Sequence, residues 1–519
     1  MAVSFERIPA NIRVPLFYAE VSNAQASYFQ LEQPALLIGP MLDSGVATEF
    51  EPVLVTDANQ AYGLFGAGSV LGDMVASYRQ NDVAGTLWCI PHKQTGTAAN
   101  LTDTISGVAS ASTVMAVYIG GDRYALPVAQ GDDGPSIAAN LAALINANAF
   151  GLVVADAPPP DPPDPGRATA TDGTLTYTAK GNGTVGNDIV RTWNWRGIAG
   201  GEMFPPGITV TGEGTAGLTA NLKAGAGVPA IASVITAMGD DEYDFIGMPY
   251  TDTATLDAMQ TEMNDVAGRW SWSRQIYGHV FTSKMGTPGS LQAFGVLRND
   301  PHATVMGFAA SPTVQWRHAA ALCAQAASSL RIDPARPLQT LVMVGIQPPQ
   351  RGQRFKLTDN NTLLYSGIAT EMESGGAVAI GRCITTYRVN AWNQPDPSWL
   401  DVQTPATLAY IIRFLRQRIL QKFGRHKLAD NGTPIGFGQA TVTPNIIRAE
   451  LIAAYSELEN LGVAENMDAF KQYLIVERDA NDPNRVNVLL PPDLVNQLRI
   501  FAMLVEFRLQ YAPPSQAAA

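Results

Sequence analysis

Charged side chains are scarce in this sequence. Only 15% of its 519 residues are Asp, Glu, Lys or Arg, although 46% are hydrophobic. An average soluble protein carries roughly 25% charged residues. The shortage indicates that much of the surface is buried against other chains, such as further copies of this one. Because the length is about three times that of a typical domain of roughly 150 residues, we expect several packed units.

Basic residues are too few for a nucleic-acid-binding protein. The formal net charge is −12, whereas proteins that bind the phosphate backbone need a basic footprint to displace its counterions. The sequence has no run of about 18 apolar residues, and its start has no charged segment followed by an apolar one. We therefore expect no nucleic-acid partner and no membrane insertion, and a protein that starts out in a cytoplasm.

Residues that usually hold metals or cofactors are few and widely spaced. The three cysteines lack CxxC spacing, and none of the five histidines has HExxH spacing. GxxxxGK[ST] does not occur, and GxGxxG occurs only at residues 181–186 and 212–217, in Gly- and Thr-rich stretches that lack the pattern of a following helix. We expect no metal and no cofactor, and we interpret the cysteines as small core residues: Cys89, Cys323 and Cys383.

A serine hydrolase is the enzyme class that needs the closest test. His279 lies in residues 277–281, which have the pattern of a buried strand, and the sequence contains no GxSxG motif. We interpret His279 as a buried, hydrogen-bonded residue. No catalytic residue is expected in this chain.

Short apolar strands alternate with amphipathic helices in residues 34–95 and again in residues 225–395. This alternation predicts an α/β central domain, with a mostly parallel sheet and helices on both faces. Residues 96–224 are rich in Gly, Thr, Ala and Ser and have period-two stretches, which predict an inserted, mainly β domain. Within it, the proline-rich residues 156–165 predict an exposed loop. The strands of the central sheet are expected near residues 35–39, 86–90, 243–248, 277–282 and 303–308.

Both ends of the chain have the pattern of single strands. Residues 1–33 and 499–519 each contain alternating apolar residues and lie outside the compact units. Pro15 has no N–H, so the first strand belongs at an edge, either of its own domain or of a partner's sheet. We expect both arms to pair with sheets of neighbouring subunits. The predicted strand positions are Ile12, Val14, Leu16 and Tyr18 at the start, and Phe501, Met503, Val505, Phe507 and Leu509 at the end.

Residues 396–498 predict an α+β C-terminal domain with two capped helices followed by a hairpin. Thr404 and Thr443 each precede a proline, which is typical of a helix start, and Gly424 and Gly462 are placed to end the helices. The hairpin strands are expected at residues 473–477 and 485–490.

The first of these helices is unusually basic. Within residues 404–427 it has six cations and no carboxylate, in a chain whose net charge is −12. Two interpretations stay open: a solvated helix with favourable cations near its carboxyl end, or a surface that meets an acidic partner. The candidate residues are Arg413, Arg416, Arg418, Lys422, Arg425 and Lys427.

Several long stretches have a family likeness. They include residues 5–9, 13–16, 87–91, 237–240, 248–252, 332–340, 425–429 and 474–478, for example Ile332-Asp333-Pro334-Ala335-Arg336-Pro337-Leu338-Gln339-Thr340. In these stretches the chain resembles the tail sheath proteins of Mu-like contractile-tailed bacteriophages.

The resemblance implies a structural subunit that stacks helically around a tail tube and contracts to drive the tube through the host envelope. It implies that the C-terminal domain lies inward, that the inserted domain lies outward, and that the two arms exchange strands between neighbours. From their charge, we expect the six basic residues within residues 404–427 to face an acidic tail tube. The implied partners are copies of the chain itself, the tail tube protein, and the baseplate and tail terminator proteins. The implied location is the virion, with the host cytoplasm during assembly. A non-contractile lattice protein, such as a capsid or surface-layer subunit, and an α/β hydrolase remain the alternatives.

Overall fold

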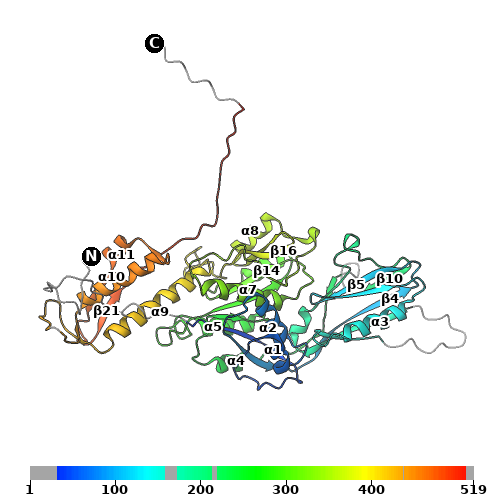
Figure 1. Ribbon diagram of the computed structural model, residues 1–519, viewed down its shortest axis with the longest axis horizontal. Coiled ribbons are helices and arrows are strands. Elements are labelled where there is room, and N and C mark those ends of the chain that lie inside the picture. The colour runs from blue at the N-terminus through cyan, green and yellow to red at the C-terminus, as the bar shows by residue number, and fades with distance from the viewer. Residues whose placement is uncertain (1–31, 158–171, 213–218, 437, 510–519) are drawn as a thin grey trace, which may run out of the picture. The chain divides into compact units, whose positions relative to one another are not determined.

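The computed structural model describes residues 32–157, 172–212, 219–436 and 438–509 (Figure 1). The chain divides into two compact units, residues 1–32 and 33–519, and every element below belongs to the second. The predicted strand at Ile12, Val14, Leu16 and Tyr18 lies outside the described residues. So do residues 158–165 of the proline-rich stretch.

The described residues contain a mixed eight-stranded sheet with the order β16-β15-β14-β13-β12-β1-β3-β2. Six neighbouring strands, from β15 to β3, run parallel, and the two end strands pair antiparallel. Strand β1 is buried at every position, as expected for an apolar run covered on both faces. The predicted mostly parallel sheet is confirmed. Its strands are β1 (Ala35–Met41), β2 (Val53–Leu54), β3 (Leu87–Lys93), β12 (Phe245–Gly247), β13 (His279–Met285), β14 (Ala303–Phe308), β15 (Ala369–Ser374) and β16 (Ala377–Arg382).

Helices connect and cover these strands (Figure 1). Helix α7 packs on α2 and on β12 and β13. The backbones of α7 and β12 lie close together, since a Cβ atom added to Gly247 of β12 would lie only 3.4 Å from Cys323 of α7. Small residues such as Cys323 permit this approach. All three cysteines are free and buried, which confirms their interpretation as core residues. The helices are α1 (Ala58–Phe65), α2 (Val70–Asn81), α4 (Ile231–Met238), α5 (Thr253–Met263), α6 (Pro288–Gly295), α7 (Gln315–Leu330) and α8 (Leu357–Tyr365).

Two four-stranded antiparallel sheets and helix α3 form the inserted region. The sheets have the orders β10-β4-β8-β7 and β11-β9-β5-β6 within the described residues. Asp103 of β4 joins the two sheets, because Arg191 and Trp193 of β9 donate hydrogen bonds of 2.7 and 3.0 Å to its carboxylate. The elements are β4 (Ala98–Gly107), β5 (Thr113–Ile119), β6 (Asp122–Val128), α3 (Gly134–Asn146), β7 (Val153–Asp156), β8 (Asp172–Asn182), β9 (Val190–Trp193), β10 (Ile208–Gly212) and β11 (Thr219–Asn221).

The start of α7 bonds the inserted region to the central sheet. Arg317 forms ion pairs of 2.7 Å with Asp73 of α2 and 3.0 Å with Asp122 of β6. Beside it, the Gln315 side chain donates a 2.6 Å hydrogen bond to Asp188. These side-chain bonds connect segments that lie more than a hundred residues apart.

Asp188 makes the stability of this junction depend on pH. Burial raises the pKa of Asp188 to about 7, with Lys284 acting in the opposite direction. The folded state therefore holds this proton more tightly than the unfolded chain, so the stabilising contribution is complete below about pH 4 and is lost as the pH rises to 7. We expect Asp188→Asn to remove about 2–3 kcal/mol of the fall in unfolding free energy between pH 5 and 8. Urea unfolding at both pH values measures this, and parallel pH profiles for the two proteins would contradict it.

The C-terminal elements begin with the long helix α9, and one expected cap is wrong. Helix α9 begins at Gln403 with Val402 as its N-cap, so Thr404 lies inside the helix and does not cap it. Thr443 does cap α10, accepting a hydrogen bond from the backbone N–H of Ile446. The predicted hairpin is present as β20 and β21. The elements are α9 (Gln403–Phe423), β17 (Lys427–Leu428), β18 (Thr441–Val442), α10 (Pro444–Asn460), β19 (Ala464–Glu465), α11 (Met467–Tyr473), β20 (Ile475–Arg478), β21 (Val486–Leu489) and β22 (Asp493–Leu494).

Candidate interaction surfaces

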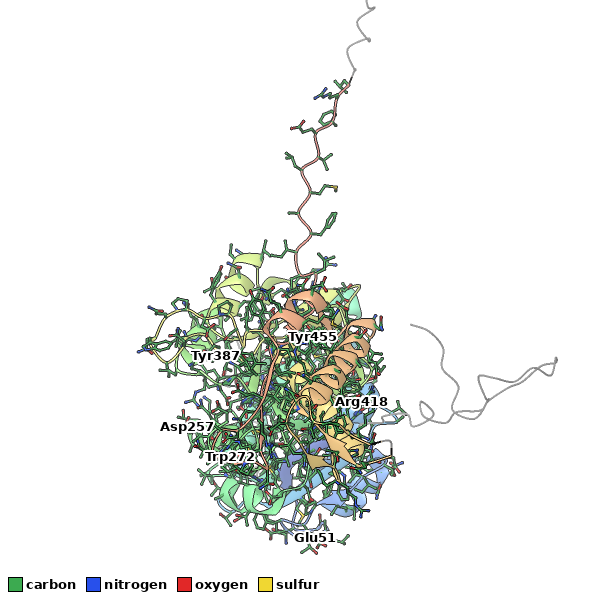
Figure 2. The ribbon with its side chains drawn as sticks, turned by 90° about the vertical axis from the view of Figure 1, so that its left-hand side faces the viewer. Glu51, Asp257, Trp272, Tyr387, Arg418 and Tyr455 are labelled. Atoms are coloured by element: carbon green, nitrogen blue, oxygen red, sulfur yellow. The ribbon has the colours of Figure 1, made fainter. Side chains whose placement is uncertain are left out.

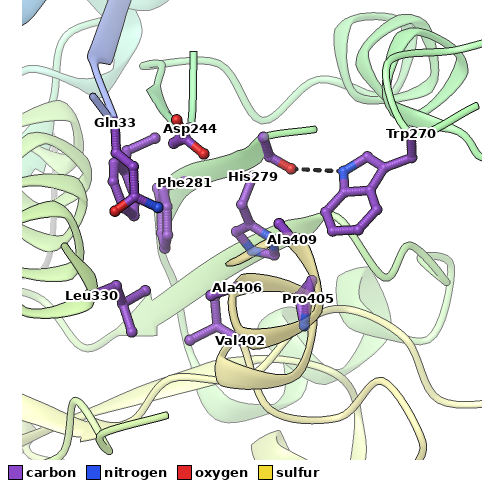
Figure 3. Close-up of a pocket in the computed structure, with 12 residues that line it drawn as sticks. Gln33, Asp244, Trp270, His279, Phe281, Leu330, Val402, Pro405, Ala406 and Ala409 are labelled. Atoms are coloured by element: carbon purple, nitrogen blue, oxygen red, sulfur yellow. Dashed lines mark hydrogen bonds between the residues drawn. The ribbon is translucent and has the colours of Figure 1, made fainter. Parts of the chain in front are cut away.

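The first half of the basic helix α9 is packed against the central sheet. Figure 3 shows Pro405 and Ala409 of α9 facing His279 and Phe281 of β13 across a small cavity. The cavity has a volume of about 20 Å³, which is room for roughly one water molecule. This part of α9 is therefore a core helix.

Arg413 also belongs to this packed half. Its side chain is 6% exposed, and its guanidinium pairs with Asp244 and, at 3.1 Å, with Glu242. It also donates a 3.2 Å hydrogen bond to the carbonyl oxygen of Ile276. Arg413 was expected to face a partner. In the structure it is buried instead, and its charge is already paired with carboxylates of its own chain.

Two further cations of α9 pair with the neighbouring helix α10. Arg418, labelled in Figure 2, bonds Glu457 at 2.8 Å and also pairs with Glu450. Lys422 bonds Glu450 at 2.7 Å. Sequence reasoning did not identify these carboxylates as partners, although the opposite charge of the two helices, basic in α9 and mostly acidic in α10, provides a weak signal. The pairs hold α10 beside α9 and neutralise part of the basic charge.

The remaining three cations are exposed to solvent. Arg416, Arg425 and Lys427 are exposed, and none of the described residues forms an ion pair with them. They lie in the second half of α9 and just after its end. The basic surface available to a partner is thus defined by these three residues, and we call it the α9 basic surface.

The C-terminal extension carries large apolar side chains in water. Phe501, Met503, Val505, Phe507 and Leu509 are between 69% and 96% exposed. Figures 1 and 2 show residues 500–509 as an extended chain, and none of the described residues forms a strand ladder with them. A solvent-exposed run of this kind is costly in a soluble protein and typically marks an interaction site.

The residues just before the extension are bonded to the folded part. Arg499 pairs with Asp401 at 3.1 Å and donates a 2.8 Å hydrogen bond to the side chain of Gln403. The side chain of Gln339 donates a hydrogen bond of 3.2 Å to the carbonyl oxygen of Leu498. The folded unit therefore ends at Arg499, and the extension begins at Ile500.

The hairpin of β20 and β21 has apolar residues on its surface. Ile475, Val488 and Leu489 are 44% to 59% exposed. The two strands pair only with each other among the described residues, so each has an unpaired edge. Open edges with apolar side chains are templates for a further strand.

The described residues offer little that resembles a catalytic centre. The Nε2 atom of His279 lies 2.8 Å from the Thr304 hydroxyl, and burial holds the pKa of His279 well below its usual value. No group of His, Cys, Asp and Glu in the described ranges has the arrangement of a metal site. Within the same ranges, every helix is too short or too polar to span a membrane.

Two family models and one full-length relative match this chain. The family described as "Phage tail sheath protein central domain" matches residues 224–386, and "Phage tail sheath C-terminal domain" matches residues 394–508. The chain is 38% identical over 518 residues to the Mu-like prophage FluMu tail sheath protein of Haemophilus influenzae, covering 98% of this chain and 100% of that protein.

The solved structures that match this chain are more distant in sequence. One is the sheath tail protein from Desulfitobacterium hafniense, with a TM-score of 0.47 and 14% identity over 93% of this chain and 97% of that one. Another is the helical sheath of the anti-feeding prophage in its contracted state, with a TM-score of 0.46 and 9% identity over 96% of this chain and 100% of that one.

Proposed function

This chain belongs to the family of Mu-like phage tail sheath proteins, and from that premise we propose that it polymerises helically around a tail tube by exchanging strands with neighbouring copies. It is a structural component of the virion tail and not an enzyme, so the capsid, surface-layer and hydrolase alternatives are withdrawn. Contraction of the polymer then drives the tube through the host envelope. The baseplate and tail terminator proteins are the expected partners at the two ends.

The observation that carries this proposal is the exposed apolar face of residues 500–509. Burying one large apolar side chain stabilises a complex by about 1.5–3 kcal/mol, whereas ordering each residue costs about 1–2 kcal/mol. An isolated extension therefore gains little by ordering alone. Pairing with a sheet edge adds main-chain hydrogen bonds and buries the alternating face, which favours the bound strand.

The unpaired edges of the β20–β21 hairpin are suited to receive such a strand. Their apolar residues Ile475, Val488 and Leu489 are exposed, and a strand added at one edge would place its own apolar side chains beside those of the strand it joins. A strand donated by one copy and received by the next links subunits into an open chain, because the two surfaces differ.

In the proposed sheath, residues 1–33 and 499–519 are arms, residues 34–95 and 225–395 form the central domain, and residues 96–224 form the outer domain. Residues 396–498 form the inner domain. The arms keep neighbours connected while the domains rotate past one another. The extended polymer is then a metastable state held by a kinetic barrier, and contraction needs no nucleotide.

We assign the contact with the tail tube to the α9 basic surface. Three exposed cations in a chain of net charge −12 can orient the subunit on an acidic tube without a large hydrophobic interface that would resist sliding. Each exposed ion pair contributes only about 0–1 kcal/mol, so the strength of the contact comes from many subunits.

Charge reversal of this surface is the test of the tube contact. The variant Arg416→Glu, Arg425→Glu, Lys427→Glu should coat purified tubes at least tenfold less well than the wild type, and wild-type coating should weaken as salt rises, because the pairs are screened. Sedimentation of coated tubes measures both effects. The unfolding free energy should change by less than about 0.5 kcal/mol, since the three side chains are exposed.

A matched control reverses three exposed cations elsewhere, at Arg196, Arg336 and Lys471. These substitutions change the net charge by the same amount, so any general effect of charge appears in both variants. Equal coating by the two triple variants, or coating that does not respond to salt, would place the tube contact on another surface.

Electron microscopy of the purified protein tests the polymer itself. A sheath subunit should form hollow tubes, whereas a shell protein forms closed particles or flat arrays. Flat or closed assemblies would overturn the proposed function.

A further inference from the structure

Trp272 is an exposed tryptophan on a rigid loop between α5 and β13. Its side chain is 82% exposed (labelled in Figure 2). The loop is held by Asn264, whose side-chain oxygen accepts hydrogen bonds from three consecutive backbone N–H groups, those of residues 266–268. Arg274 bonds Glu262 at 2.9 Å, and the buried Arg269 donates to the carbonyl oxygen of Gly239 at 3.1 Å. A tryptophan presented by such a loop loses little conformational freedom when it binds.

A large open cavity lies near the other ends of the same strands. Its volume is about 460 Å³, and its walls include Met285, Pro288, Ala310 and Phe355, with Arg354 at one side. Binding sites for small ligands typically have volumes of roughly 300–1,000 Å³. The cavity therefore has room for an indole ring and offers it apolar contacts beside a guanidinium group, which stacks well on aromatic faces.

Trp272 and the cavity lie at opposite ends of the strands of the central sheet. Trp272 precedes β13, whereas the cavity is formed by residues that directly follow β13 and β14, such as Gly286 and Ala309. Because β13 and β14 are parallel, the first position is at the amino ends of the strands and the second is at the carboxyl ends. One subunit cannot bring the two together, but two copies in succession can.

The charges around the two surfaces are complementary. Exposed carboxylates lie beside the Trp272 loop at Asp240, Asp241 and Asp265, whereas the segment that borders the cavity has the exposed cations Arg351 and Lys356. Arg274 partly neutralises the first side through its pair with Asp240, and Glu373, paired with Arg354, and the cavity-lining Asp359 partly neutralise the second. The remaining charges favour the approach of one surface to the other.

From this arrangement, and resting on the proposed function, we infer that Trp272 of one copy inserts into the cavity at the carboxyl ends of β13 and β14 in the next copy. The two surfaces differ, so the contact is heterologous and repeats from copy to copy. Contacts of that kind produce an open helical assembly unless they close into a ring. Exposed tryptophans that fill a partner's pocket are also the residues that most often dominate binding energy.

Substitution of Trp272 tests the contact against a matched control. We expect Trp272→Ala to raise the protein concentration needed for tube formation by about tenfold or more. Trp392→Ala removes a tryptophan that is equally exposed, at 80%, from a different loop, and it should leave that concentration unchanged. Light scattering during polymerisation measures the threshold. Equal thresholds for the two variants would overturn the inference.

A cross-link identifies the occupant of the cavity. In tubes of the double variant Ser273→Cys, Ala310→Cys, which keeps Trp272, a short bifunctional thiol reagent should produce a ladder of covalent oligomers, whereas either single variant should remain largely monomeric. The three native cysteines are buried and should not react. Normal tubes of the double variant without a ladder would overturn the inference and leave the proposed function intact. Failure of the wild type to form tubes would overturn both.

Discussion

Deletion of residues 500–519 is expected to abolish polymerisation while changing the unfolding free energy of the monomer by less than about 0.5 kcal/mol. The side chains from Ile500 to Leu509 that are large and apolar are 69% or more exposed, so the folded unit loses few contacts with them. An assembly joined by this strand loses one of its links at every subunit. Urea unfolding and electron microscopy measure the two effects, and tubes formed by the truncated chain would contradict the strand-exchange proposal.

Two controls accompany the deletion. The first measures the effect of the attachment at Arg499, and the second identifies which face of the extended strand is recognised. Arg499→Ala should reduce monomer stability, because the partly buried Asp401 loses one of its two arginine partners and the Gln403 side chain loses a hydrogen bond. Phe501→Asn and Leu504→Asn both change highly exposed apolar residues, 79% and 86% exposed, on opposite faces of an extended strand. If the face containing Phe501 is the buried one, Phe501→Asn should impair assembly more strongly. Equal effects would indicate that no single face is recognised.

Substitution of Arg413 by alanine is expected to destabilise the monomer by about 3–5 kcal/mol, because it leaves the buried carboxylate of Asp244 without its partner. Asp244 is 7% exposed, and Arg413 is its ion-pair partner beneath α9. Guanidinium-induced unfolding measures the loss. Arg416→Ala, one turn further along the same helix and exposed, is the matched control and should change stability by less than about 0.5 kcal/mol.

The penalty for losing Arg413 should depend on pH. Burial raises the pKa of Asp244, and Arg413 acts against this effect. Without the guanidinium, that pKa rises further above its unfolded value, so Asp244 stays protonated to higher pH and the deficit is smallest in acid. The difference in unfolding free energy between wild type and Arg413→Ala should therefore be larger at pH 8 than at pH 5. A difference that does not change with pH would show that the arginine acts through packing instead.

The parts of the fold that were predicted correctly have local signals. Apolar runs such as residues 35–39 and 303–308 are strands because continuous burial on both faces requires continuous hydrophobicity. Thr443-Pro444 predicted a helix start that the structure has. The similar pair at Thr404-Pro405 failed, because packing of Val402 and Gln403 against the core extends the helix by two residues, and tertiary contacts outweigh a cap of roughly 1 kcal/mol.

The sequence alone determined the family, the alternation that produces the parallel sheet, and the presence of six cations on one helix. Only the tertiary structure decided which of those cations are available to a partner. Arg413 is paired with Asp244, far earlier in the chain, and Arg418 and Lys422 are paired with Glu450 of a different helix. The same holds for Trp272 and the cavity, which lie at opposite ends of parallel strands. Hydrophobic periodicity is a local property of the chain, whereas charge pairing and surface geometry depend on which distant segments pack against each other, and a single sequence carries no local signal for that.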